Sequence, residues 1–85
     1  MQIRWDPEKS GRLKKERGVS FEEIVLSDLL GTIKHPGRSH QRILLFDYGG
    51  YVWAVPCVVN AEEMFLKTLY RSRKYKRMSE RGELP

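Results

Sequence analysis

The spacing of apolar residues changes near the middle of the chain. Up to about residue 31 they recur at helical intervals between polar residues, whereas from Gln41 onward they form nearly continuous runs. The first half therefore predicts helices and the second half predicts strands. A short stretch at residues 3–5 predicts one further strand before the first helix.

The first helix is expected from Pro7 to Arg17. Asp6 is a good N-cap, and Pro7 suits the first helical position because the N–H that it lacks would be unpaired there anyway. Leu13 is the one clear core residue of this helix, so the helix should lie on the surface. Gly18 is expected to end it.

A second helix is expected over residues 21–30. Ser20 and Glu23 match the capping box S-x-x-E, and Val19 and Ile24 occupy the two positions of a hydrophobic staple. A broad apolar stripe continues from there to residue 30. This helix is therefore the one predicted to pack across a sheet.

Two strands, at residues 42–48 and 51–59, should form a hairpin around Gly49 and Gly50. The second strand is apolar on both faces, which is typical of a central strand. Pro56 cannot donate to a ladder, so it requires either a bulge or a sheet edge.

A third strand is predicted at residues 64–70, and residues 72–81 should continue as a short helix or a loose tail. The expected fold class is α+β in a single domain, residues 1–85. Its plan is two N-terminal helices packed on a three- to four-stranded antiparallel sheet, with a short basic C-terminal extension.

Charge is distributed unevenly along the chain. The net charge is +5, and all of this excess lies in residues 66–85, which contain seven Lys and Arg against two Glu. A local positive field of this kind suits a polyanion such as RNA. A solvated basic tail without a specific ligand is the alternative.

Cysteine and hydropathy patterns limit the class of protein. The single cysteine, Cys57, cannot form an internal disulfide, and no apolar run has transmembrane length. We therefore expect a cytoplasmic protein without membrane association. Cys57, His35 and His40 match no zinc-site spacing, so neither a metal site nor a cofactor is predicted.

RNA cleavage is a chemistry that needs no cofactor. The 2′-hydroxyl attacks the adjacent phosphate, and the protein assists proton transfer and stabilises the phosphorane. Arg71 and Arg73, two apart at a predicted strand end, should point the same way and bind phosphate, and His35 is the candidate acid or base. Further candidates for RNA contacts are Trp5, Lys9, Arg12, Arg38, Tyr70 and Lys74.

Each candidate also has a purely structural interpretation. His35 precedes Pro36-Gly37 and would then be a solvated turn residue. Trp5 would be a core anchor rather than a platform for base stacking. Arg71 and Arg73 would pair with carboxylates such as those of Glu62 and Glu63, or with a partner's carboxylates.

The sequence resembles BrnT-type toxins, whose fold is similar to that of RelE-like ribonuclease toxins. The resemblance extends from about residue 3 to 78 and is carried by Ile3-Arg4-Trp5-Asp6-Pro7-Glu8-Lys9, Lys15-Glu16-Arg17-Gly18-Val19-Ser20-Phe21-Glu22-Glu23, Lys34-His35-Pro36, Gly50-Tyr51-Val52-Trp53-Ala54-Val55-Pro56 and Phe65-Leu66-Lys67-Thr68-Leu69-Tyr70-Arg71-Ser72-Arg73-Lys74. It implies a toxin of a type II toxin–antitoxin system: an endoribonuclease that inhibits translation and is neutralised by a cognate antitoxin. Operator DNA would be bound only indirectly, through the antitoxin.

The family's strand-end motif S-A-R maps onto Arg71-Ser72-Arg73, which makes Arg73 the first residue to carry over. No acidic residue lies between Arg71 and Ser79, and this departure shifts the expected acid–base role to His35. Two alternatives stay open, namely a toxin of this fold that binds a protein target and a non-catalytic nucleic-acid-binding module. RNA could be met free or on the ribosome.

Overall fold

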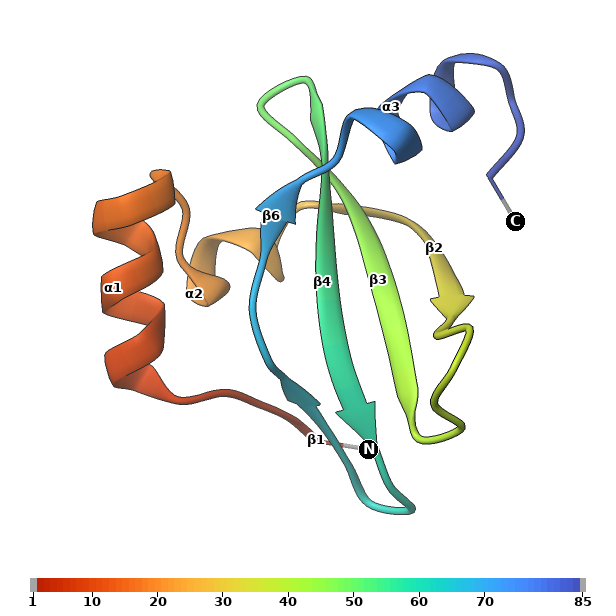
Figure 1. Ribbon diagram of the computed structural model, residues 1–85. Coiled ribbons are helices and arrows are strands. Elements are labelled where there is room, and N and C mark those ends of the chain that lie inside the picture. The colour runs from red at the N-terminus through yellow and green to blue at the C-terminus, as the bar shows by residue number, and fades with distance from the viewer. Residues whose placement is uncertain (1, 85) are drawn as a thin grey trace.

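A sheet runs through the middle of the protein, with helices on both of its faces (Figure 1). The computed structural model describes residues 2–84. The elements are β1 (Gln2–Arg4), α1 (Pro7–Arg17), α2 (Phe21–Ile24), β2 (Asp28–Lys34), β3 (Gln41–Tyr48), β4 (Tyr51–Val59), β5 (Glu63–Leu66), β6 (Tyr70–Arg71) and α3 (Arg73–Glu80).

The sheet is mixed, with the strand order β1-β5-β4-β3-β2 and with β6 paired to β4 beyond the end of β5. β1 is parallel to β5, in the register Gln2 to Glu63, and the other pairings are antiparallel. The prediction of two helices on a three- to four-stranded antiparallel sheet was therefore wrong. Within residues 2–84 there are six strands and three helices.

The first helix forms as predicted, from Pro7 to Arg17. The Asp6 carboxylate accepts a hydrogen bond from the Glu8 amide at 3.0 Å and so caps the first turn. Gly18 ends the helix with φ at +81°, a conformation that costs glycine little. Leu13 is buried, as predicted.

The second helix begins as predicted but ends after one turn, at Ile24. Its capping box is complete, and Val19 and Ile24 are both buried. Beyond it the prediction was wrong, because residues 28–34 form β2 and pair with β3. A short apolar run fits a helix stripe or a strand equally well locally, and here pairing with the apolar β3 decides the outcome.

The hairpin between β3 and β4 is confirmed. Gly49 and Gly50 have φ of +62° and +77°, which a tight two-residue turn of type I′ requires. Pro56 lies in the central strand β4, where the neighbouring chain leaves the sheet between β5 and β6. Its carbonyl accepts from the Lys67 amide at 2.9 Å, so the side of Pro56 that lacks an N–H donor faces Lys67, just past the end of β5, and not the ladder with β3.

Side chains alternate along β3 and β4 and so form a core on each face. The larger core contains Phe21 and Ile24 from α2 and Trp53 from β4. The smaller core lies on the opposite face, where Tyr75 of α3 packs against it. Cys57 belongs to the larger core, and burial raises the pKa of its thiol. No helix among the described residues is long and apolar enough to span a membrane.

Candidate nucleic-acid interface

The junction between β6 and α3 carries the arginines that the sequence singled out. Arg71 pairs with Trp53 of β4, and the next amide, that of Ser72, donates to the Val52 carbonyl at 2.9 Å. The Ser72 hydroxyl accepts from the Tyr75 amide at 3.2 Å and so caps α3. The chain therefore passes directly from a sheet ladder into a helix.

This cap corrects the expected placement of the two arginines. Strand alternation would have put Arg71 and Arg73 on one sheet face, but Ser72 ends the strand and Arg73 is the first residue of α3. Arg71 shares the sheet face of its partner Trp53, which is the face that α1 and α2 cover. Both arginines are exposed.

The aromatic ring of Tyr51 is the point where three elements meet. The guanidinium carbon of Arg71 lies 5.0 Å from the ring centroid, and the Lys76 ammonium lies 5.9 Å from it. Lys76 also donates to the Gly50 carbonyl at 2.9 Å, which joins α3 to the hairpin turn. We call Tyr51, Arg71 and Lys76 the Tyr51 cluster. Sequence reasoning missed it, because nothing local relates a hairpin residue to a helix 25 positions later.

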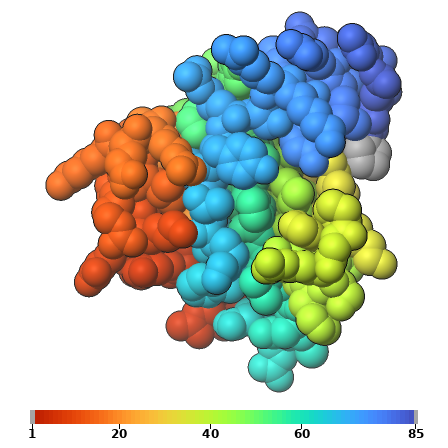
Figure 2. Space-filling view, viewed as in Figure 1, coloured from red at the N-terminus to blue at the C-terminus, as the bar shows by residue number. Residues whose placement is uncertain are grey.

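One face of α3 extends this positive surface. Residues three or four apart on a helix share a face, so Arg73, Lys76 and Arg77 lie together. Within residues 2–84 these three side chains and Arg71 form no ion pair with a carboxylate. The blue residues near the C-terminal end of the chain, which include β6 and α3, form a continuous surface at the top of the molecule in Figure 2. Four cations without local neutralisation make a surface suited to phosphate groups.

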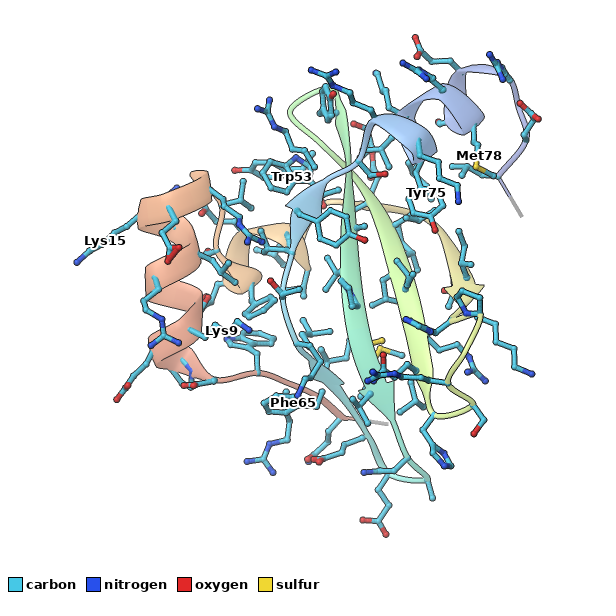
Figure 3. The ribbon with its side chains drawn as sticks, viewed as in Figure 1. Lys9, Lys15, Trp53, Phe65, Tyr75 and Met78 are labelled. Atoms are coloured by element: carbon cyan, nitrogen blue, oxygen red, sulfur yellow. The ribbon has the colours of Figure 1, made fainter. Side chains whose placement is uncertain are left out.

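Tyr70 and Lys74 lie on the other side of the sheet from Arg71. Tyr70 pairs with Ala54, whose side chain belongs to the smaller core, and Lys74 lies 5.5 Å from the ring of Tyr75. Partial burial raises the pKa of the Tyr70 hydroxyl, and the nearby Tyr75 adds to the shift. Tyr75 and Met78 project from α3 (Figure 3). Tyr70 and Lys74 are therefore not part of the Tyr51 cluster.

His35 does not share a site with Arg71. Lys34, immediately before His35, pairs with Arg42 of β3, and Arg42 pairs with Cys57 of β4. Arg71 pairs with Trp53 of β4 instead. Cys57 and Trp53 are four residues apart along β4, and β2 and β6 are three strand spacings apart across the sheet. The backbones of Lys34 and Arg71 are therefore separated by about 19 Å. Imidazole and guanidinium cannot reach one phosphodiester from there.

The loop that carries His35 has its own hydrogen-bond network. The His35 ring nitrogen Nδ1 accepts from the Gly37 amide at 3.2 Å, and the His35 amide donates to the Gln41 carbonyl at 3.1 Å. Arg38 is exposed in the same loop, and its carbonyl accepts from Gln41 at 3.2 Å. His35 and Arg38 therefore form a second group, at the other end of the strands from α3.

Trp5, Lys9 and Arg12 form a third group, on and beside α1. The Trp5 indole N–H donates to Glu22 at 3.2 Å, and its ring centroid lies 6.1 Å from that of Phe21. Trp5 is half-buried and packs against the larger core beside α2. Lys9 projects from α1 (Figure 3), and Arg12 is exposed on the same helix.

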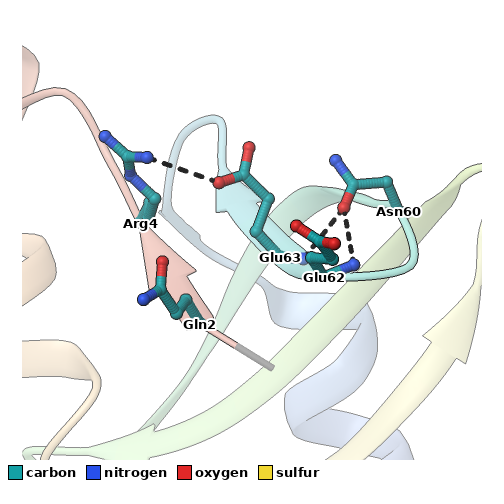
Figure 4. Close-up of a pocket in the computed structure, with 5 residues that line it drawn as sticks. All are labelled: Gln2, Arg4, Asn60, Glu62 and Glu63. Carbon is teal, nitrogen blue, oxygen red and sulfur yellow. Dashed lines mark hydrogen bonds and ion pairs between the residues drawn. The ribbon is translucent and has the colours of Figure 1, made fainter.

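A polar pocket of about 530 Å³ opens where β1 meets the turn before β5 (Figure 4). Three of the five side chains that line it already make contacts within the fold. Asn60 accepts from the amides of Glu62 and Glu63 at 2.9 and 2.8 Å, and Glu63 pairs with Arg4 at 3.6 Å. Glu63 therefore neutralises Arg4 and not Arg71. No group of three or more potential metal ligands occurs in the part of the chain that the structure describes.

Comparison with known proteins identifies the fold. No protein-family model matches the chain. No match was found among curated proteins. Among solved structures, the crystal structure of the Brucella abortus ribonuclease toxin, BrnT, superimposes with a TM-score of 0.55. The fold is that of a BrnT-type toxin.

The superposition covers 85% of this chain and 96% of the BrnT chain, so the BrnT-type fold accounts for most of both molecules. The sequences are only 18% identical over it. The fold suggested by the sequence resemblance is therefore confirmed. The expected number and direction of the strands were wrong, because the sheet has six strands and β1 is parallel to β5.

Proposed function

We propose that this chain is an RNA-cleaving toxin neutralised by a cognate antitoxin, and that it binds RNA with the two cations of the Tyr51 cluster, Arg71 and Lys76, and with the basic face of α3. The observation that carries the proposal is a set of four cations without ion pairs, Arg71, Arg73, Lys76 and Arg77, on a BrnT-type fold. Counterion release makes such a surface favourable for a phosphate backbone.

Arg71 and Arg73 would act on the scissile phosphate. Attack by the 2′-hydroxyl forms a bond between phosphorus and O2′ and breaks the bond to O5′, leaving a 2′,3′-cyclic phosphate and a 5′-hydroxyl. Negative charge builds on the non-bridging oxygens during this step, and guanidinium groups stabilise it with paired N–H donors. This chemistry requires the arginines to be free of carboxylate partners, as they are within residues 2–84.

The separation of His35 from Arg71 supports a second candidate, RNA binding without cleavage. Proton transfer at a phosphodiester held by the arginines needs a group within hydrogen-bond reach, and the imidazole of His35 lies outside that reach. A protein that holds RNA by charge and leaves it intact would need no such group.

Cleavage of total RNA in EDTA tests these candidates. The variants are R71A, R73A and H35A, with K15A as a matched control because Lys15 is an exposed cation on α1. We expect cleavage by the parent protein, K15A and H35A, and its loss in R71A and R73A. Loss of cleavage in H35A alone would indicate that the catalytic site is at the loop between β2 and β3. Gel retardation without cleavage would support the binding module.

Growth arrest on expression, with neither RNA cleavage nor RNA retardation, would instead support a protein target.

The antitoxin part of the proposal rests on charge complementarity, because an acidic segment would neutralise the unpaired cations. Co-expression with the product of the adjacent reading frame, followed by size-exclusion chromatography, tests it. A chain that always elutes alone would contradict it.

A further inference from the structure

Tyr51 is held firmly against the protein on one side. It is the first residue of β4, directly after the Gly49-Gly50 turn, and it pairs with Tyr48 across the hairpin. Its half-buried side chain packs against the larger core. The ring therefore offers a fixed surface to any group that rests on it.

Two cations rest on that ring, and each comes from a different element. Arg71 is placed 5.0 Å from the ring centroid by the ladder between β6 and β4, and Lys76 is placed 5.9 Å from it by α3. Both distances lie within the range in which an aromatic ring attracts a cation. Lys76 is further restrained by its bond to Gly50.

Arg71 differs from Lys76 in the hydrogen-bond donors that remain available to a ligand. The guanidinium is flat and carries five N–H donors, so contact with a ring restricts its orientation without using those donors. No hydrogen bond or ion pair of the Arg71 side chain occurs within residues 2–84. The ring therefore limits the freedom of the guanidinium and leaves its donors available to an external acceptor.

We propose that Tyr51 is a positioning residue: its ring holds the Arg71 guanidinium in the orientation in which it binds a phosphate group of RNA. This rests on the function proposed above and adds a specific role for Tyr51, which acts through Arg71. Fixing a flexible arginine in advance lowers the entropy lost when phosphate binds.

The aromatic ring, rather than the hydroxyl, is the part that acts. No hydrogen bond of the Tyr51 hydroxyl occurs among the described residues. Y51F should therefore behave like the parent protein, whereas Y51L keeps apolar bulk and loses the attraction for cations. We expect Y51L to weaken RNA binding about two- to fivefold, the size of an exposed cation–π contact.

A double-mutant cycle separates positioning from direct contact. The probe is a fluorescently labelled single-stranded RNA oligonucleotide, and the proteins are the parent, Y51F, Y51L, R71A and Y51L/R71A. If Tyr51 acts through Arg71, Y51L has no further effect in the R71A background. Additive losses would mean that Tyr51 affects RNA binding by a route other than Arg71, and they would overturn the proposal. Unchanged binding by Y51L would overturn it as well.

A measurement on the free protein keeps this proposal distinct from the proposed function. The NMR signals of the Arg71 side chain should show a ring-current shift in the parent and in Y51F, and the shift should disappear in Y51L. Thermal unfolding of Y51L checks that the variant folds. A parent protein that fails to bind RNA would refute the proposed function and with it the RNA role of Tyr51. Absence of the ring-current shift would refute positioning alone.

Discussion

Lys14 Nζ lies 2.9 Å from the Glu23 carboxylate and joins the last turn of α1 to α2. The hydrogen bond from Lys14 and the backbone N–H of Ser20 lower the pKa of Glu23 from 4.5 to about 2. Because the folded-state pKa is the lower one, this group stabilises the fold above about pH 4.5. The contribution is lost as the pH falls from 4.5 toward 2.

E23Q should therefore lower the melting temperature at neutral pH and reduce its dependence on pH between 4.5 and 2. The glutamine oxygen can still accept from the Ser20 amide, so the capping box is retained. Thermal unfolding across this pH range measures the effect. E16Q is the control, because Glu16 is exposed on α1. Equal pH profiles for E23Q and the parent protein would contradict the assignment.

Ser10 is a buried hydroxyl that connects α1 to α2. It accepts from the Phe21 amide at 2.9 Å and donates to the Glu22 carboxylate. S10A leaves the buried Phe21 N–H unpaired, and we expect a loss of about 1–3 kcal/mol in the free energy of unfolding. Urea denaturation measures it. S39A, at an exposed loop serine, should change stability little.

The positive φ of Gly50 provides a backbone test of the hairpin. An L-residue at φ +77° is strained, so G50A should destabilise the protein by about 1–2 kcal/mol. Gly37 is a matched control, since its φ lies outside the positive range and a Cβ there meets open space. A loss for G37A equal to that for G50A would show that the turn geometry is not the cause.

Leu29 distinguishes the observed strand from the helix that the sequence predicted. In a packed helix stripe it would be buried, but in β2 it is 57% exposed, whereas Leu66 is 1% exposed. L29A should change stability by no more than about 0.5 kcal/mol. L66A should cost about 2–5 kcal/mol. Comparable losses in the two variants would favour the predicted helix.

Arg17 links α1 to residues 68 and 69, immediately before β6. It donates to the Leu69 carbonyl and, at 3.2 Å, to the Thr68 hydroxyl. R17A should therefore speed amide hydrogen exchange in residues 67–71, because local opening there loses a restraint. K15A serves as the control for charge removal. Unchanged exchange in R17A would rule out this restraint.

Local signals in the sequence were sufficient wherever the determining contacts are local. Asp6 and Gly18 bound α1, and the glycine pair forms the hairpin, because caps and tight turns depend on a few adjacent residues. The end of α2 depends instead on the pairing of residues 28–34 with β3, and the position of β1 depends on its pairing with β5, far along the chain. No short-range pattern encodes such pairing.

The candidate site shows the same contrast between local signals and long-range contacts. Arg71 and Arg73 are exposed and lie within the basic segment of residues 66–85, but their role at a site stays a prediction. The expected grouping with His35 was not found, because that grouping depended on loop and strand ends meeting at one end of the sheet. Tyr51 was overlooked as a partner of Arg71, since only the register between β6 and β4 brings the two together.

The parallel pairing of β1 with β5 affects the order in which the protein can fold. Gln2 and Glu63 are partners although they are 61 positions apart in the sequence, so their contact closes a loop that contains most of the chain. Closing a long loop costs entropy before its contacts form, and the adjacent hairpin of β3 and β4 closes far more cheaply. During synthesis, the first strand must therefore remain without a partner until most of the polypeptide has been made.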